Sequence, residues 1–245
     1  MPVHTLRSHP QRAIRDSVLA ALKGIRFHYQ PIVSAVQGTI LGVEALVRPA
    51  GPPFRGRARE FVAEVRRAGE ARLLRAALFR SAREALERLP SHTRLFLNVA
   101  RADLEDGLFL ALAEEAPRVV LELDEEERPE AVRPSLQEYR RRGFRIALDD
   151  FGAGSMAWHG LATLSPDLIK LDRSMIQGLA TESLRREAVS ALLRLGRRTG
   201  IEVICEGVER PEERDLLLEL GADLMQGFLF GVARPLTRRA RGRIS

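Results

Sequence analysis

The chain alternates short apolar runs with longer amphipathic segments over about 220 residues. Short apolar runs bounded by Gly, Pro or charged residues are typical of buried strands. Eight segments show this pattern: 27–33, 39–48, 94–99, 119–125, 146–148, 168–169, 202–209 with its loop, and 224–228. The longer segments carry apolar residues at a period close to 3.6, which predicts helices between the strands.

The predicted helices fit between these strands without a long structureless insert. They cover 13–22, 59–68, 71–89, 102–115, a stretch from Pro129 to a stop at Gly143, 183–199 and 211–220. Alternating strands and helices favour an α/β fold of the β/α barrel type. A doubly wound open sheet is the alternative, but no Gly-x-Gly-x-x-Gly or Walker signature follows a strand. We place the barrel domain at 25–236, between an N-terminal extension with a short helix (1–24) and a basic tail (237–245).

The stretch from Arg145 to Asp172 carries the first chemical signal. Its apolar run ends in two adjacent carboxylates, Asp149 and Asp150, and the next apolar run carries Lys170. Two like charges at a strand end are costly unless a cation compensates them. We therefore interpret the pair as part of a metal site.

Polar residues recur at the same end of the other predicted strands, which is where the active site of an α/β barrel lies. These residues are Gln30, Glu44, Arg48, Asn98, Glu122, Asp149, Asp150, Lys170, Glu206 and Gln226. Carboxylate and amide oxygens without a His or Cys cluster favour Mg²⁺ or Mn²⁺ over Zn²⁺. The acids exceed the needs of one ion, so the pattern predicts two ions. Two ions suit the attack of an activated water on a phosphodiester.

Lysine is rare in this chain, which makes Lys170 informative. Of the 39 lysine and arginine residues, only Lys23 and Lys170 are lysines. A lysine can change its pKa and orient or deprotonate a water, whereas an arginine stays charged. Lys170 is therefore a candidate catalytic residue, and Arg48 is a candidate to hold a phosphate oxygen.

Composition narrows the remaining choices. The 245 residues and 45% hydrophobic content suit one barrel with a substantial core. No run approaches the roughly 20 apolar residues of a membrane span. We expect no signal peptide, no membrane partner and a cytoplasmic location, which the single Cys205 also fits. The net charge of +6 comes from basic residues scattered among acids, so no DNA or RNA polymer is expected as a partner.

The strand-end residues stand in motifs that resemble those of the EAL-domain family of cyclic-di-GMP phosphodiesterases. Glu44-Ala45-Leu46 matches the signature of that family. The resemblance runs from about Phe27 to Pro235 and rests on eight motifs in order: Tyr29-Gln30-Pro31-Ile32, Glu44-Ala45-Leu46-Val47-Arg48, Leu97-Asn98-Val99, Glu122-Leu123-Asp124-Glu125, Asp149-Asp150-Phe151-Gly152-Ala153-Gly154, Leu168-Ile169-Lys170-Leu171-Asp172, Glu206-Gly207-Val208-Glu209 and Gln226-Gly227-Phe228. A three-letter motif alone is weak, whereas eight motifs in order are specific.

The resemblance implies a modified (βα)8 TIM-type barrel with an antiparallel first strand. It implies the hydrolysis of cyclic-di-GMP to linear pGpG. One Mg²⁺ or Mn²⁺ ion would bind the side chains of Glu44, Asn98, Glu122 and Asp149. A second ion would bind those of Asp149, Asp150 and Glu206. Lys170 would contact the attacking water, so the implied catalytic residues are Lys170, Glu44 and Asp149.

The resemblance also assigns the periphery of the site. The implied substrate contacts are Gln30, Leu46, Arg48 and Gln226. Glu125 would tether the Asp-Asp-Phe-Gly loop without touching metal, and Glu209 would also support the surroundings of the site. Family members commonly form homodimers through the loop and helix after Asp150, which are here about 152–164.

The chain departs from the family pattern in three places. Pro49 stands where an aromatic residue usually follows the arginine of the second strand, and Arg55-Gly56-Arg57-Ala58-Arg59 replaces an apolar helix entry. The segment Ser155-Met156-Ala157-Trp158-His159 differs from the usual Tyr- and Ser-rich loop. These departures concern guanine packing, loop ordering and the dimer contact rather than the metal ligands.

Two other functions remain open at this stage. A non-catalytic receptor could bind cyclic-di-GMP or a protein partner, although such proteins typically lose a metal carboxylate and none is lost here. A different metal-dependent barrel enzyme, such as an enolisation catalyst, would explain the acids and the lysine but not the ordered motifs.

Overall fold

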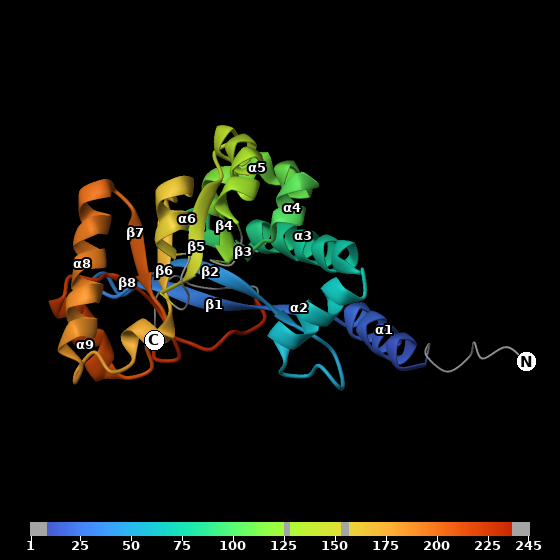
Figure 1. Ribbon diagram of the computed structural model, residues 1–245, viewed down its shortest axis with the longest axis horizontal. Helices are drawn as coiled ribbons and strands as arrows, with labels where there is room; N and C mark the ends of the chain where they lie inside the picture. Colours follow the sequence, from blue (N-terminus) through green and yellow to red (C-terminus); the bar gives the residue numbers. More distant parts are fainter. Residues whose placement is uncertain (1–8, 125–127, 153–156, 237–245) are drawn as a thin grey trace, which may run out of the picture.

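Eight strands close into a barrel in the computed structural model, which describes residues 9–124, 128–152 and 157–236 (Figure 1). The strands follow one another around the barrel in sequence order: β1 Arg26–Ser34, β2 Thr39–Arg48, β3 Arg94–Asn98, β4 Val119–Asp124, β5 Arg145–Phe151, β6 Leu168–Leu171, β7 Glu202–Cys205 and β8 Leu224–Gln226. The predicted β/α barrel is confirmed, and the open sheet is not.

The first strand runs against its neighbours. β1 is antiparallel to both β2 and β8, while the other neighbouring strands pair in parallel. The antiparallel register places Gln30 opposite Glu44, and Ile32 opposite Gly42. The modified barrel that the resemblance implied is therefore confirmed.

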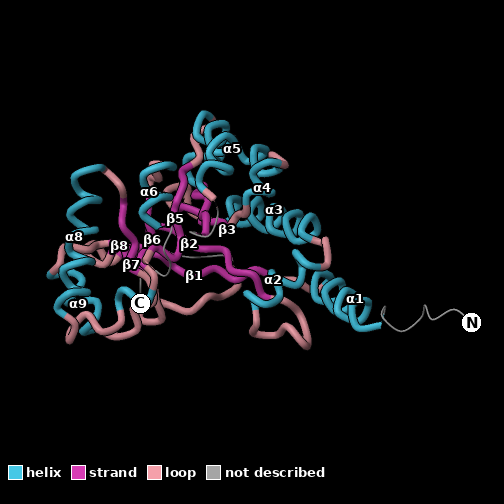
Figure 2. The backbone as a smooth tube through the Cα atoms, viewed as in Figure 1, coloured by secondary structure: helices cyan, strands magenta, loops and turns pink. Residues whose placement is uncertain are grey.

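Helices cover the outside of the barrel (Figures 1 and 2). They are α1 His9–Lys23, α2 Ala58–Arg67, α3 Ala71–Arg88, α4 Arg101–Glu105, η1 Leu108–Arg118, α5 Pro129–Arg141, α6 Ala157–Leu164, α7 Arg173–Ile176, α8 Ser183–Thr199 and α9 Pro211–Glu219. α1 packs mainly on α2, where Val18 and Ala21 share a buried cluster with Phe61 and Val65. None of the described helices is long and apolar enough to cross a membrane.

Apolar side chains fill the barrel interior near the amino ends of the parallel strands. This plug consists of buried residues from six strands: Ile32, Phe96, Val120, Ala147, Leu168 and Ile204. Gly42 makes room for it, because a Cβ atom at this position would lie 2.6 Å from Cε2 of Phe96. The plug fills this end of the barrel, and the active sites of such barrels lie at the opposite mouth.

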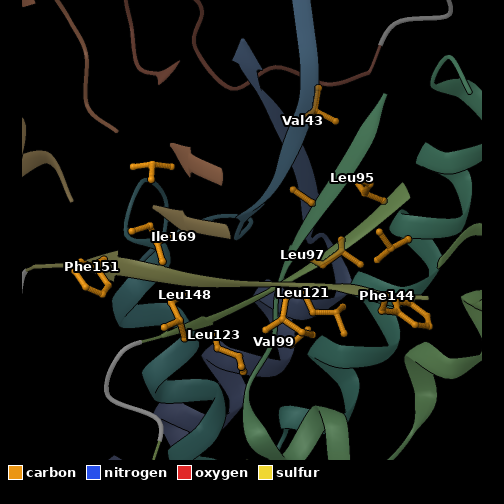
Figure 3. Packing of buried hydrophobic residues seen from close by; sticks show 14 of the residues in the cluster. Val43, Leu95, Leu97, Val99, Leu121, Leu123, Phe144, Leu148, Phe151 and Ile169 are labelled. Carbon is orange, nitrogen blue, oxygen red and sulfur yellow. The ribbon is translucent and has the colours of Figure 1, made fainter. Parts of the chain in front are cut away.

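The outward faces of the strands form a second apolar layer beneath the helices. Leu95 and Leu97 of β3 and Leu121 and Leu123 of β4 all lie in this layer (Figure 3). Cys205 of β7 is fully buried in the same layer. Both faces of the parallel strands are thus covered, which explains their nearly continuous apolar sequences.

The predicted helix 102–115 is wrong as a single element. Gly107 adopts a left-handed φ of 68° and divides the segment into α4 and the 3₁₀ helix η1. Glycine carries no Cβ penalty in this conformation, so it ends α4 here. Periodicity alone did not reveal the break, because apolar residues continue at helical spacing on both sides of Gly107.

Candidate metal-dependent active site

The polar residues of the parallel strands lie two positions after an inward-facing residue. The pairs are Gly42–Glu44, Phe96–Asn98, Val120–Glu122, Ala147–Asp149, Leu168–Lys170, Ile204–Glu206 and Leu224–Gln226. Because side chains in a strand alternate with a period of two, this spacing stacks a polar layer on the apolar plug. β1 runs in the opposite direction and adds Gln30, two positions before Ile32. The structure thus brings the predicted strand-end residues together at the mouth.

Lys170 lies at the centre of this polar layer and is only 1% exposed. Its Nζ atom lies 2.7 Å from Oε1 of Glu122, 2.7 Å from Oε1 of Glu206 and 2.9 Å from Oδ1 of Asp149. Oε2 of Glu44 is 3.4 Å away. One buried cation therefore faces four carboxylates.

Amide side chains hold the Glu44 carboxylate from the other side. Nδ2 of Asn98 donates to Oε1 of Glu44 at 2.8 Å and to Glu122 at 3.0 Å. Nε2 of Gln226 donates to Oε2 of Glu44 at 2.7 Å and lies 3.4 Å from Oε1 of Gln30. Hydrogen bonds thus join residues of five strands around the Glu44 carboxylate.

The charges in the layer shift each other's pKa values. Burial alone would lower the pKa of Lys170, but the four carboxylates together hold it well above its usual value. Burial would raise the pKa of Glu44, but Lys170 and the two amide donors keep it below its usual value. Both groups are therefore charged at neutral pH, as an internal ion pair requires.

Other carboxylates are pushed toward the neutral form. Burial and the negative charge of Glu44 raise the pKa of Glu122 well above its usual value. Burial, opposed by Lys170, raises the pKa of Glu206 to about 8. Burial and Asp149 raise the pKa of Asp150. With all its carboxyls ionised, the layer would have more negative charge than Lys170 compensates, which is the condition that favours a bound cation.

A β-bulge aims two consecutive aspartates at the mouth. β5 pairs with β6 at Leu148 and again at Phe151, with a register shift between these residues. Leu148 and Phe151 both lie in the outer apolar layer (Figure 3). Regular alternation would place them on opposite faces, so one extra residue has been inserted. Asp150 takes a φ of 53°, a left-handed value that aspartate tolerates better than most residues and that often marks functional sites.

The side chains present fit divalent cations. One oxygen each from Glu44, Glu122 and Asp149 lies within 4.8 Å of the others, and the same holds for Asp149, Asp150 and Glu206. Oε1 of Glu122 and Oδ1 of Asp149 are buried and form ion pairs with Lys170, but neither atom accepts a well-aligned hydrogen bond. Hard oxygen ligands of this kind suit Mg²⁺ or Mn²⁺. Asp149 belongs to both clusters, so two ions would share it.

The remaining predicted residues that the structure describes lie around the mouth. Leu46 and Arg48 follow Glu44 on β2 and are half-buried, and Nη1 of Arg48 donates to the backbone oxygen of Val47 at 2.9 Å. Glu209 lies in the loop after β7 and pairs with Nη1 of Arg173 at 3.1 Å. Glu125 lies outside the described residues.

Two arginines near the mouth escaped the sequence analysis. Arg173 begins α7, and Arg59 of α2 reaches Asp150, with Nη2 3.4 Å from Oδ2. Arg59 belongs to the Arg55–Arg59 segment, whose departure from the family pattern was the one sequence feature that could have indicated a role for this arginine. Its partner could not be read from the sequence, because 91 positions separate Arg59 from Asp150.

The EAL domain model matches residues 11–235, so this chain belongs to the EAL domain family. NbdA of Pseudomonas aeruginosa, a cyclic di-GMP phosphodiesterase, is 30% identical over 92% of this chain and 30% of its own length. PdeL of Escherichia coli, another cyclic di-GMP phosphodiesterase, is 27% identical over 90% of this chain and 66% of its own length. The chain spans only 34% or less of the first curated relatives that it matches.

Solved structures of related domains share the fold. The PaMucR phosphodiesterase in complex with c-di-GMP has 28% sequence identity and a TM-score of 0.77, covering 91% of this chain and 98% of that chain. The Klebsiella pneumoniae BlrP1 calcium and cyclic-di-GMP complex has 27% identity and a TM-score of 0.77, covering 90% of this chain and 57% of that chain. Both of these structures are complexes with the cyclic dinucleotide.

Gly227 is required where the chain leaves the polar layer after Gln226. A Cβ atom at this position would lie 2.0 Å from the backbone oxygen of Val208 and 2.4 Å from its nitrogen. We expect Gly227→Ala to lower the free energy of unfolding by about 1–3 kcal/mol, because backbone atoms must shift. Urea unfolding measures this loss.

Gly38→Ala provides the comparison for Gly227→Ala. Gly38 has a φ of +63° but open space around it, so only backbone strain is added. We expect a loss of about 1–2 kcal/mol at Gly38 without a change in metal binding. Unchanged stability of Gly227→Ala would contradict the close approach of the two loops.

Proposed function

We propose that this chain hydrolyses cyclic-di-GMP to linear pGpG with the help of two Mg²⁺ or Mn²⁺ ions. The observation that carries the proposal is the polar layer, in which four carboxylates of the family motifs surround the buried ammonium group of Lys170. Relatives named cyclic di-GMP phosphodiesterases support the substrate and the reaction. The acids and amide at the mouth support the use of hard cations.

The metal ligands follow from the two clusters. Glu44, Asn98, Glu122 and Asp149 would hold one ion, and Asp149, Asp150 and Glu206 the other. Asn98 now turns its NH₂ group toward two carboxylates, so its amide must rotate to offer oxygen to an ion. Bound ions would supply Lewis-acid activation of water and would neutralise charge on the phosphate.

Lys170 would act on the attacking water. Once ions engage the carboxylates, its ammonium group can donate a hydrogen bond to the water and fix the oxygen in line with the phosphorus atom. The water oxygen forms a bond to phosphorus, the bond to the 3′-oxygen breaks, and that oxygen takes up a proton. One of the two phosphodiester bonds is thus opened, which gives pGpG.

The mouth offers groups for the nucleotide. Arg48 hydrogen-bonds to backbone through one guanidinium nitrogen, which leaves other N–H groups for a phosphate oxygen. Oε1 of Gln226 is buried without a hydrogen-bond partner and could accept from a substrate N–H group. Gln30 and the half-buried Leu46 complete the proposed contacts.

We also propose a homodimer through the segment 152–164 and a cytoplasmic location. Trp158 of α6 is 60% exposed, while its ring lies 5.5 Å from that of Phe151 in an edge-to-face arrangement. An exposed tryptophan held on one side is suited to an interface. Residues 153–156 of the segment lie outside the described part. The lone thiol, Cys205, is buried and fits a reducing compartment.

The proposed function is tested by incubating the purified chain with cyclic-di-GMP and Mg²⁺ or Mn²⁺, followed by chromatography of the products. The expected result is metal-dependent formation of pGpG, which EDTA abolishes. Intact nucleotide despite measurable binding would instead favour a non-catalytic receptor. Turnover confined to a carboxylate substrate would favour the enolisation enzyme.

Metal binding should release protons at about pH 7. The pKa of Glu206 is raised to about 8, so this carboxyl is mostly protonated below that value and must lose its proton to bind a cation. The apparent Mn²⁺ affinity should therefore increase as the pH rises toward about 8. Calorimetry in buffers of different ionisation enthalpy measures the protons released. Absence of release at about pH 7, or equal release by Glu206→Gln, would contradict this prediction.

A further inference from the structure

Asp150 is the carboxylate of the two clusters that Lys170 does not pair with. The ammonium group of Lys170 pairs with Glu44, Glu122, Asp149 and Glu206. Among the described residues, the ion-pair partner of Asp150 is Arg59, through the 3.4 Å contact between Nη2 and Oδ2. In the described part of the chain, Lys170 and Arg59 are therefore the cations that pair with the carboxylates of the two clusters, and they pair with different ones.

The two cations differ in how firmly they are held. Lys170 is 1% exposed and is enclosed by the barrel, so it cannot leave. The side chain of Arg59 is 90% exposed and comes from the first turn of α2, outside the barrel. An exposed ion pair of this kind contributes little and breaks readily. Arg59 can therefore leave Asp150 without disturbing the fold.

We propose, on the basis of the proposed function, that Arg59 is a displaceable counter-ion of the Asp149–Asp150–Glu206 cluster. A divalent cation must replace the guanidinium group at Oδ2 of Asp150 before this cluster is fully available as a ligand set. Arg59 thereby weakens metal binding at the second position and sets the metal concentration at which this position fills.

The test is Mn²⁺ binding to the nucleotide-free full chain, with free Mn²⁺ measured by electron paramagnetic resonance. We expect Arg59→Ala to bind the weaker of the two ions about two- to five-fold more tightly, as loss of an exposed ion pair predicts. Arg59→Lys retains the positive charge and should stay close to the unaltered chain. This readout requires no hydrolysis.

Arg57→Ala is the matched control. Arg57 lies two positions away, is exposed, and pairs with Glu60 at 3.2 Å rather than with the site. The variant makes the same change in net charge, so its Mn²⁺ affinity should not change. An equal increase in both variants would mean that surface charge alone is responsible, and the inference would be overturned.

A second control uses Asp150→Asn. In this background Arg59→Ala should have no further effect on Mn²⁺ affinity, and a persisting effect would overturn the inference. Unchanged or weaker Mn²⁺ binding by Arg59→Ala alone would also overturn it. If the Arg59 effect is present but cyclic-di-GMP stays intact, the phosphodiesterase proposal fails and this inference stands. If the chain binds no Mn²⁺, both fail.

Discussion

Lys170→Met should abolish the proposed hydrolysis of cyclic-di-GMP and destabilise the metal-free protein by about 3–5 kcal/mol, the usual effect of removing one partner of a buried ion pair. The substitution leaves Glu44 and Glu122, which are 5% and 1% exposed, without their shared cation. These carboxyls must then be protonated or remain buried as uncompensated charges. Urea unfolding without metal and product formation with Mn²⁺ measure the two effects.

Mn²⁺ should restore much of the stability of Lys170→Met but not its turnover. The ion can replace the ammonium group as a counter-charge, whereas the hydrogen bond to the attacking water is lost. Lys23→Met is the natural control, because Lys23 is the only other lysine and lies exposed at the end of α1. It should cost at most about 1 kcal/mol through the helix dipole. Full stability or full turnover of Lys170→Met would refute the role of Lys170 that we propose.

Asp149→Asn should reduce turnover by about 10³-fold or more, because the side chain of Asp149 belongs to both clusters. Loss of ligand charge at both positions removes several kcal/mol of transition-state stabilisation. Mn²⁺ titration should detect weakened binding of both ions. The fold should persist, because the substitution also removes a charge that raises the pKa of Glu122, Glu206 and Asp150.

Asp150→Asn should distinguish the two metal positions by their Mn²⁺ affinities. Asp150 belongs only to the cluster with Asp149 and Glu206, so one ion should bind with unchanged affinity and the other more weakly. Asp149→Asn and Asp150→Asn make the same chemical change at adjacent positions, so a difference in metal binding between them reflects the cluster to which each aspartate belongs. Equal loss of both ions in the two variants would contradict the shared role of Asp149.

Much of the site could be predicted from the sequence because of its position in each strand. Glu122 interrupts the apolar run of β4, and Lys170 interrupts that of β6. A charged residue inside a buried strand needs partners, and strands that close into a barrel bring such residues to one end. Pattern and charge were therefore sufficient to place Glu44, Asn98, Glu122, Lys170 and Glu206 at a common mouth.

Other features depend on contacts that the chain order hides. The bulge in β5 turns Asp150 toward Asp149, whereas strict alternation would send these side chains to opposite faces. The contact of Arg59 with Asp150 requires the docking of α2 beside the mouth. The break at Gly107 was missed for a local reason, since its left-handed backbone leaves no mark in the apolar pattern.

The sequence by itself determined the barrel class, the positions of its strands along the chain and the identity of the polar residues at their ends. The physical reason is that alternating burial and the cost of burying a charge both depend on residues that are close together in the chain, so the local pattern reveals them. Only the tertiary structure decided that Lys170 pairs with four carboxylates and that Arg59 pairs with the fifth, which is Asp150. Which charges meet depends on the closure of the barrel, on one inserted residue in β5 and on the docking of α2, and these bring together residues far apart in the chain.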